Sequence, residues 1–233
     1  MRILAIESSA VTASVAILED DTLVVEYTIN HKMTHSQTLL PMIDEIFSMV
    51  QLKPDDVDVI AVSKGPGSFT GLRIGAATGK GIALALDKKM VAVPTLAAMA
   101  YNLYGDSRYI CPVMDARRKH LYSGIYTFDG DRLITVRDVN LESYDELAEE
   151  LAGLDGQVVL VGDGVDVAGD VLKEQLGDKC VLAPAHIKTQ RGGSVALLAK
   201  QMADNGEYTD ADELKPDYLR PSQAEREKAQ HES

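Results

Sequence analysis

The chain of 233 residues contains an internal repeat, and this repeat limits its possible folds more strongly than its composition does. Each half opens with three short segments of strand character and continues with alternating helical and strand-like segments. The turn "DGDRLI" at 129–134 echoes "EDDTLV" at 19–24, about 110 residues earlier. Two halves that begin β-β-β and continue α-β-α-β-α predict a duplicated α/β protein with mixed sheets.

The hydrophobic pattern also places the individual elements. In the first half we expect strands at 2–7, 13–18, 23–29, 57–62 and 90–93 and helices at 35–50, 71–86 and 95–104. In the second half we expect strands at 109–114, 121–128, 132–136, 157–161 and 180–182 and helices at 144–152, 165–176 and 193–205. This order is used by the actin-like, sugar-kinase-like ATPase (ASKHA) fold, with two β-β-β-α-β-α lobes. The expected domains are a first lobe at 1–106, a reduced second lobe at 107–206 and a tail at 207–233.

A glycine-rich stretch, "SKGPGSFTGLRIGAATGKGIALAL" at 63–86, has the look of a phosphate-binding loop before a helix. Gly75 to Gly81 leaves only three residues between its first two glycines and has a glycine in place of the metal-binding hydroxyl of a P-loop. Gly65 to Gly71 spaces its last glycine one residue too far for the dinucleotide fingerprint and puts proline in the tight turn. Both tests disfavour a phosphate cradle.

The same glycines form a row on the expected helix. Gly71, Gly75 and Gly79 recur every fourth residue and therefore lie along one face. Each interior glycine destabilises a helix by about 1 kcal/mol relative to alanine, so the row calls for an explanation from packing. A face without side chains lets another backbone approach closely, either from the same domain or from a partner chain.

Composition narrows the class of function. With 23 basic and 36 acidic residues, the formal charge of -13 disfavours a protein that holds nucleic acid by general neutralisation of phosphates. Cys111 and Cys180 have no metal-type neighbours in the sequence, so we expect reduced thiols in the cytoplasm. The apolar run in the opening residues "MRILAIESS" is too short for a signal peptide, and no apolar stretch of the sequence is long enough to span a membrane. We expect a soluble cytoplasmic protein that does not contact membranes.

The tail differs from the rest of the chain in composition. Pro216 and Pro221 favour an extended "KPDYLRP" segment, and the last dozen residues are polar and charged. Two interpretations fit this pattern: a solvated terminus, or an arm that becomes ordered on a partner.

Several single residues have two interpretations. Glu7 follows a strand and has the chemistry of a general base, but no second carboxylate or histidine is placed to help it, which favours a hydrogen-bonded structural role. His35 fits the start of a helix better than a metal site. The "VGDGVD" segment at 161–166 fits either a nucleotide-site turn or a plain strand-to-helix loop. Neither Ser8 nor Ser9 lies in a nucleophile elbow.

Six stretches together carry a resemblance to a known family. They are "ILAIESSAVTASVAI", "HSQTLLPMI", "GPGSFTGLRIGAATGKGIALAL", "VPTLAAMA", "PVMDARRKHLYSGIY" and "PDYLR". With them the chain resembles the bacterial TsaB family, also called YeaZ, of the glycoprotease-like superfamily. The resemblance is most specific over Gly65 to Gly79 and at Asp115-Ala116-Arg117, and weakest between 135 and 203. It implies a non-catalytic subunit of the machinery that makes threonylcarbamoyladenosine in tRNA.

The resemblance also implies what this chain lacks. TsaD, the related catalytic subunit, carries a His-x-x-x-His metal pair, whereas the corresponding stretch 93–99 has no histidine, and apolar carbons and a thioether cannot replace imidazole. In this fold, backbone N–H groups of the first hairpin in each half hold phosphates. The hairpin of the second half, 115–120, has no glycine, so the two hairpins together would form only a degenerate nucleotide site. The hairpin loop of the first half contains Glu7, Ser8 and Ser9. We expect no cofactor on the isolated chain, and ATP and metal in partner subunits.

The resemblance further implies a function in an interface. The chain would pair with TsaD through the helices at 35–50 and 71–86, act with TsaE, meet tRNA through the complex, and form homodimers when alone. The expected interface residues are Leu39, Ile43, Ile46, Phe47, Gly71, Gly75 and Gly79. The cationic turn fits either a contact with an anion or tRNA or an exposed charged loop; its residues are Arg117, Arg118 and Lys119.

The sequence is also compatible with two other classes of function. One is an active ATP-dependent kinase or acyl transferase of the same fold, which predicts tight binding of Mg-ATP by the isolated chain. The other is a peptidase, which the name of the superfamily suggests. No catalytic triad, dyad or zinc motif in the sequence supports the peptidase.

Overall fold

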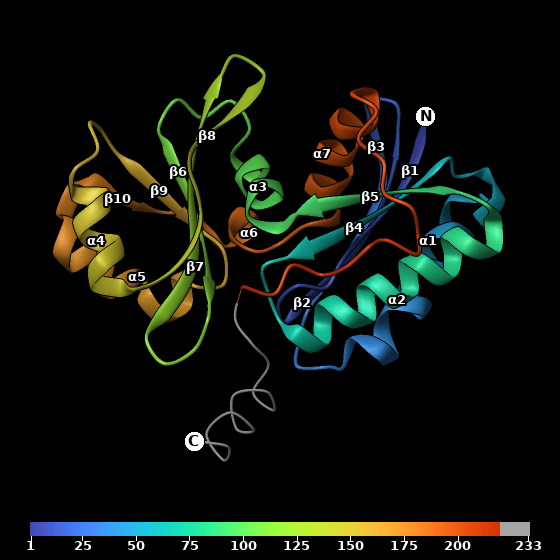
Figure 1. Ribbon diagram of the computed structural model, residues 1–233, viewed down its shortest axis with the longest axis horizontal. Coiled ribbons are helices and arrows are strands. Elements are labelled where there is room, and N and C mark those ends of the chain that lie inside the picture. Colours follow the sequence, from blue (N-terminus) through green and yellow to red (C-terminus); the bar gives the residue numbers. More distant parts are fainter. Residues whose placement is uncertain (220–233) are drawn as a thin grey trace.

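The computed structural model describes residues 1–219 and contains two five-stranded mixed sheets side by side (Figure 1). The first sheet has the order β3-β2-β1-β4-β5. Its strands are β1 (Arg2–Glu7), β2 (Thr12–Glu19), β3 (Thr22–Asn30), β4 (Val59–Gly65) and β5 (Lys89–Pro94). From its β8 edge, the second sheet has the order β8-β7-β6-β9-β10. Its strands are β6 (Tyr109–Asp115), β7 (His120–Asp129), β8 (Arg132–Ser143), β9 (Val158–Val161) and β10 (Cys180–Leu182).

The two sheets share one topology. In each sheet the first three strands pair antiparallel as two hairpins, and the fourth and fifth strands add in parallel beyond the first strand. Parallel pairs require crossover connections, which the helices between these strands supply. The expectation of a duplicated fold with mixed sheets is therefore confirmed at the level of strand order.

Helices cover both faces of the first sheet. On one face lie α1 (His35–Val50) and α2 (Phe69–Leu86), and on the other lies α7 (Gly192–Asp204). In the second sheet, α4 (Tyr144–Ala152) and α5 (Val165–Leu176) pack on one face and α3 (Thr95–Ala100) packs on the other, and the short helix α6 (Ala185–Lys188) precedes α7. Because side chains alternate along a strand, Leu4 and Ile6 of β1 pack beneath α1 and α2, while Ile3 and Ala5 pack on the opposite face with α7. This two-sided burial explains why the strands read as continuous apolar runs.

The position of α7 corrects the expected domain boundary. This helix follows the second lobe in the sequence, but Figure 1 shows it beside the first sheet, where its alanines pack against β1, β4 and β5. The N–H of Gly192 donates to Ser14 Oγ at 2.8 Å, and Arg191 pairs with Glu26 of β3. The second lobe therefore ends before α7, near residue 190, and not at 206.

The tail is also corrected in its described part. Residues 207–219 lie on the first lobe of their own chain: Leu214 is 2% exposed, and the N–H of Asp217 donates to the carbonyl of Lys64 at 2.7 Å. This segment is neither a solvated end nor an arm that needs a partner to become ordered. The rest of the expected tail, 220–233, lies outside the described residues.

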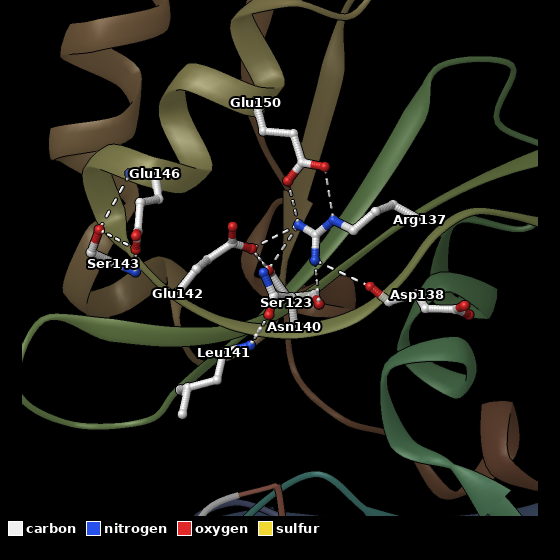
Figure 2. A network of polar contacts seen from close by, with 9 residues as sticks. All are labelled: Ser123, Arg137, Asp138, Asn140, Leu141, Glu142, Ser143, Glu146 and Glu150. Carbon is white, nitrogen blue, oxygen red and sulfur yellow. Dashed lines mark hydrogen bonds and ion pairs between the residues drawn. The ribbon is translucent and has the colours of Figure 1, made fainter.

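The second lobe contains an ion network that joins its sheet to α4 (Figure 2). The guanidinium of Arg137 donates from Nη2 to Glu142 Oε1 at 2.7 Å and from Nε to Glu150 Oε1 at 3.0 Å. Ser123 of β7 completes the network by donating its hydroxyl to Glu142 and accepting from Arg137. Because both carboxylates face one cation, loss of Arg137 would leave Glu142 buried without a counter-charge.

Candidate functional site

A cleft of about 870 Å³ lies between the lobes, where the first hairpin of each half meets loops from both lobes. Ser9 and Ala10 line it from the β1–β2 turn, and Arg117 and Arg118 line it from the β6–β7 turn. The first turn of α2 and the loop before α5 close its sides. The degenerate nucleotide-site loop and the cationic turn, which are far apart in the sequence, thus share one cleft.

Glu7 lies at the end of β1, and its side chain is enclosed by its own lobe. Its residue is 1% exposed, and its two carboxylate oxygens accept from the N–H of Ser9 at 2.6 Å and from the hydroxyl of Ser63. Burial raises the pKa of this carboxyl above its ordinary value, although these hydrogen bonds oppose the shift. The geometry agrees with the structural role favoured for Glu7, since it anchors the turn and does not face the cleft.

The β1–β2 turn is bound to its own lobe by its backbone. The N–H of Ser68 donates to the carbonyl of Ser9 at 2.6 Å, and His35 Nε2 donates to the carbonyl of Ala10 at 2.7 Å. A Cβ at Gly67 would lie 2.4 Å from the oxygen of Ser9, so only glycine permits this approach. His35 therefore serves the start of α1 and this turn, as expected from its place in the sequence.

The glycine row of α2 faces inward, which corrects the interface expected there. A Cβ at Gly71 would lie 2.1 Å from the carbonyl oxygen of Ser8, and one at Gly75 would lie 2.2 Å from Ser8 Oγ. At Gly79 it would lie 2.5 Å from Val62 Cγ1. The glycines let α2 settle on β1 and β4 within one lobe, and Ser8 Oγ donates to the carbonyl of Gly71 at 2.9 Å.

The apolar row of α1 is internal as well. Its four residues are all buried in the core between α1, α2 and the first sheet; they are Leu39, Ile43, Ile46 and Phe47. They cannot present their side chains to a partner without unfolding the lobe. A partner that contacts these two helices would meet their opposite faces.

The outward faces of α1 and α2 carry a different set of apolar residues. Leu40 and Met49 are exposed on opposite flanks of α1, and Leu84 of α2 is 62% exposed. Three small residues at fourfold spacing accompany Leu84 on α2 and are also exposed; they are Ala77, Gly81 and Ala85. Among residues 1–219, nothing lies within 4 Å of a Cβ placed at Gly81, so packing within this part of the chain does not explain the glycine. Sequence reasoning missed this face, although Gly81 is a helical glycine that does not belong to the row of Gly71, Gly75 and Gly79.

The cationic turn has an uncommon backbone. Arg117, Arg118 and Lys119 have φ values of 67°, 56° and 58°, and such conformations cost about 1–2 kcal/mol per residue for L-amino acids. Asp115 holds the turn by accepting from the N–H of Arg117 at 2.8 Å, and it pairs with the same guanidinium at 3.1 Å. The three cationic side chains are exposed, and those of Arg117 and Arg118 line the cleft.

The loop before α5 supplies an acidic group to the cleft. Burial raises the pKa of Asp163 in this loop, and Asp163 Oδ1 accepts from Gln190 Nε2 at 2.7 Å. Gly162 has φ +113°, and a Cβ there would lie 2.2 Å from the carbonyl oxygen of Val113. The glycine is explained by this strand-to-helix packing. Gln190 was not anticipated, because its distance in sequence hides its contact with Asp163.

Residues 1–219 lack two features that would have indicated other functions. No group of three or more His, Cys, Asp or Glu side chains in this range is arranged to hold a metal ion. Nor does the described part of the chain contain a helix with the length and apolar character needed to cross a membrane. Cys111 and Cys180 are buried free thiols, and burial raises the pKa of both.

Known structures share this architecture. The ROK hexokinase of Thermus thermophilus matches with a TM-score of 0.50 at 10% identity, covering 88% of this chain and 100% of that chain. At such low identity the match speaks for the fold alone, and it confirms the expected sugar-kinase-like fold. YeaZ from Pseudomonas aeruginosa matches with a TM-score of 0.81 at 26% identity, covering 94% of this chain and 99% of that chain.

Sequence comparison identifies the family. The family model described as TsaD, tRNA N6-adenosine threonylcarbamoyltransferase, matches residues 23–228. The tRNA threonylcarbamoyladenosine biosynthesis protein TsaB of Bacillus subtilis is 32% identical over 228 residues, which cover 97% of this chain and 96% of that protein. With similarity along nearly the whole of both chains, this chain belongs to the TsaB family, whose members are named for the biosynthesis of threonylcarbamoyladenosine in tRNA.

Proposed function

We propose that this chain is a non-catalytic scaffold and activating subunit that heterodimerises with TsaD in the machinery that places threonylcarbamoyl on tRNA. The observation that carries the proposal is the outward face of α2. An exposed glycine inside a helix costs about 1 kcal/mol, and a Cβ added at Gly81 would meet nothing within 4 Å among residues 1–219. Flanked by Ala77 and Ala85 and beside the exposed Leu84, it fits a helix that must accept another helix at short distance.

The cleft supports the non-catalytic part of the proposal. Backbone N–H groups would have to hold the phosphates of a nucleotide there, yet the N–H of Ser9 is bonded to Glu7, and the facing turn carries long side chains at three successive positions. The proposed function does not require any residue of this cleft to take part in a reaction. On this account ATP and metal belong to the partner subunits TsaD and TsaE, and this chain has no cofactor of its own.

The cationic turn has a place in the same proposal. Its strained backbone holds Arg117, Arg118 and Lys119 outward on a chain of net charge -13, where they form a local positive surface. An anionic group of a partner or the tRNA in the assembled complex is the contact that this surface favours. In the absence of TsaD, the exposed apolar face of α1 and α2 would pair with a second copy of the chain.

The test is a mixing experiment with the TsaD homologue of the same organism, followed by analytical ultracentrifugation. Leu84→Asp places a charge on the outward face of α2, and Val171→Asp is the matched control, because Val171 is an exposed apolar residue on α5 of the second lobe and does not line the cleft. Wild type and Val171→Asp should form a heterodimer, whereas Leu84→Asp should lose it. Equal behaviour of the two variants would show that this face is not the interface.

The alternative is an active ATP-dependent kinase or acyl transferase, which the size of the cleft favours. Titration calorimetry of the isolated chain with Mg-ATP separates the two functions. The scaffold proposal expects no tight binding. Tight binding accompanied by turnover would establish the alternative, whatever the result of the mixing experiment.

A further inference from the structure

The segment 207–219, called the strap below, runs along the first lobe and reaches the cleft between the lobes (Figure 1). Its first part is firmly held. The N–H of Thr209 donates to the carbonyl of Met90 in β5 at 2.9 Å, and the side chain of Leu214 is buried in the core with Ile60 and Val62. These contacts anchor the strap at the edge of the first sheet.

The second part of the strap is held by contacts near the surface. The N–H of Asp217 donates to the carbonyl of Lys64, and its carboxylate pairs with Lys64 Nζ at 3.0 Å while both groups are partly exposed. The ring of Tyr218 lies 4.4 Å from that of Phe69, and its hydroxyl accepts from Arg73 Nε at 3.1 Å. The guanidinium of Arg73 also lies over the Phe69 ring, at 3.9 Å from its centroid.

The fold provides a seat for this second part. Gly65 has φ +122°, and a Cβ at this position would lie 2.7 Å from the carbonyl oxygen of Asp217. Only glycine allows both the backbone conformation and this approach. The strap therefore ends in a defined position against β4 and the first turn of α2.

The end of the strap forms a wall of the cleft. Asp217, Tyr218 and Leu219 line the cleft between the lobes and also a smaller pocket of about 350 Å³ beside Pro66, Pro94 and Val139. Withdrawal of these three residues would join the two spaces and widen access to the β1–β2 turn.

We propose that residues 215–219 are a lid on the cleft, which opens by local detachment of Asp217 and Tyr218 while Leu214 stays anchored. The reason is the unequal strength of the two parts. An ion pair between partly exposed groups contributes little to stability, and Tyr218 keeps two fifths of its surface in water, whereas detachment of Leu214 would expose a fully packed side chain. Segments held in this way open locally, without global unfolding.

Hydrogen exchange and thiol labelling test the lid together. Arg73→Ala removes the group that bridges Phe69 and Tyr218 without altering the strap, and Arg132→Ala, an exposed arginine of the second lobe, is the control. A Ser9→Cys background reports opening of the cleft, because Ser9 lines the cleft but its side chain is fully buried, so a reagent reaches position 9 only when the cleft opens. The native thiols of Cys111 and Cys180 lie in the core of the second lobe and do not line the cleft, so opening of the lid should leave their labelling unchanged.

A lid predicts three results for Arg73→Ala. The amide of Asp217, which donates to the carbonyl of Lys64, should exchange about tenfold faster, the change that corresponds to a loss of 1.4 kcal/mol, while the hydrogen-bonded amides of Thr209 and Leu214 should keep their wild-type rates. Labelling of Cys at position 9 by a small disulfide reagent should accelerate by a similar factor. The proposal is overturned if the amides of Thr209 and Leu214 exchange faster together with that of Asp217, or if faster exchange at Asp217 leaves the labelling rate unchanged. Circular dichroism confirms that each variant is folded.

Discussion

Replacement of Gly81 and Gly75 by alanine, one at a time, should change the stability of the isolated chain in opposite directions. Both glycines lie inside α2, so each substitution gains about 1 kcal/mol of helix propensity. At Gly81 the new methyl group meets nothing within 4 Å, and the whole gain should remain. Gly81 also has an ordinary helical φ, so the substitution brings no backbone strain.

At Gly75 the new methyl group would lie 2.2 Å from Ser8 Oγ. The hydroxyl must then rotate and lose its hydrogen bond to Gly71, or the helix must move away from β1. Overpacking costs about 1–3 kcal/mol, and a contact of 2.2 Å belongs in the upper part of that range, at about 2–3 kcal/mol. After subtraction of about 1 kcal/mol of helix propensity, we expect a net destabilisation of about 1–2 kcal/mol.

Thermal unfolding followed by circular dichroism measures both effects. For a chain of this size, about 1 kcal/mol shifts Tm by about 2–4 °C, so Gly81→Ala should raise Tm by that amount and Gly75→Ala should lower it by a similar amount or more. A lower Tm for Gly81→Ala, or an unchanged one for Gly75→Ala, would refute the assignment of the two helix faces. The same Gly81→Ala variant should bind TsaD more weakly, because its methyl group occupies the contact face.

Two further predictions concern buried charges. Glu7→Gln should make the free energy of unfolding less dependent on pH. Because the pKa of Glu7 is raised in the folded state, the folded protein keeps this proton at pH values where the unfolded chain has lost it, so wild-type stability falls as pH rises above about 4.5, by at most about 1.4 kcal/mol per pH unit. Chemical unfolding between pH 5 and 8 measures this slope. A slope equal in both proteins would contradict the structural assignment of Glu7. Arg137→Met should lower the free energy of unfolding, measured by urea denaturation, by about 3–5 kcal/mol, because Glu142 stays buried without its partner. Adding Glu142→Gln to this variant should restore part of the lost stability. A decrease below about 1 kcal/mol would show that the network contributes little.

Sequence pattern predicted most of the secondary structure, because apolar periodicity is a local property. Helices 35–50, 144–152 and 165–176 match α1, α4 and α5 residue for residue. β8 is longer than expected, ending at 143 and not at 136, because an edge strand with one exposed face carries polar residues that do not mark a strand. The short helix α6 was not expected at all.

Contacts between distant segments were harder to predict. The row of Gly71, Gly75 and Gly79 correctly indicated a close approach, but a strand of the same lobe and a helix of a partner satisfy that pattern equally well. Likewise the apolar face of α7 indicates burial without indicating which sheet covers it. The strap carries a single deeply buried apolar residue, Leu214, which is too weak a signal to separate an ordered segment from a solvated one.

The return of α7 to the first sheet makes the second lobe an insertion within the first. One face of the first sheet, with Ile3 and Ala5 of the first strand, is covered only when a helix nearly 200 residues later arrives. During synthesis from the N-terminus, the second lobe can therefore complete its own core before the first lobe is closed. A fragment that stops at residue 106 would expose this apolar face and aggregate. The second sheet packs on α4 and α5 on one face and on α3 on the other, so a fragment of residues 95–190 is the better candidate for independent folding.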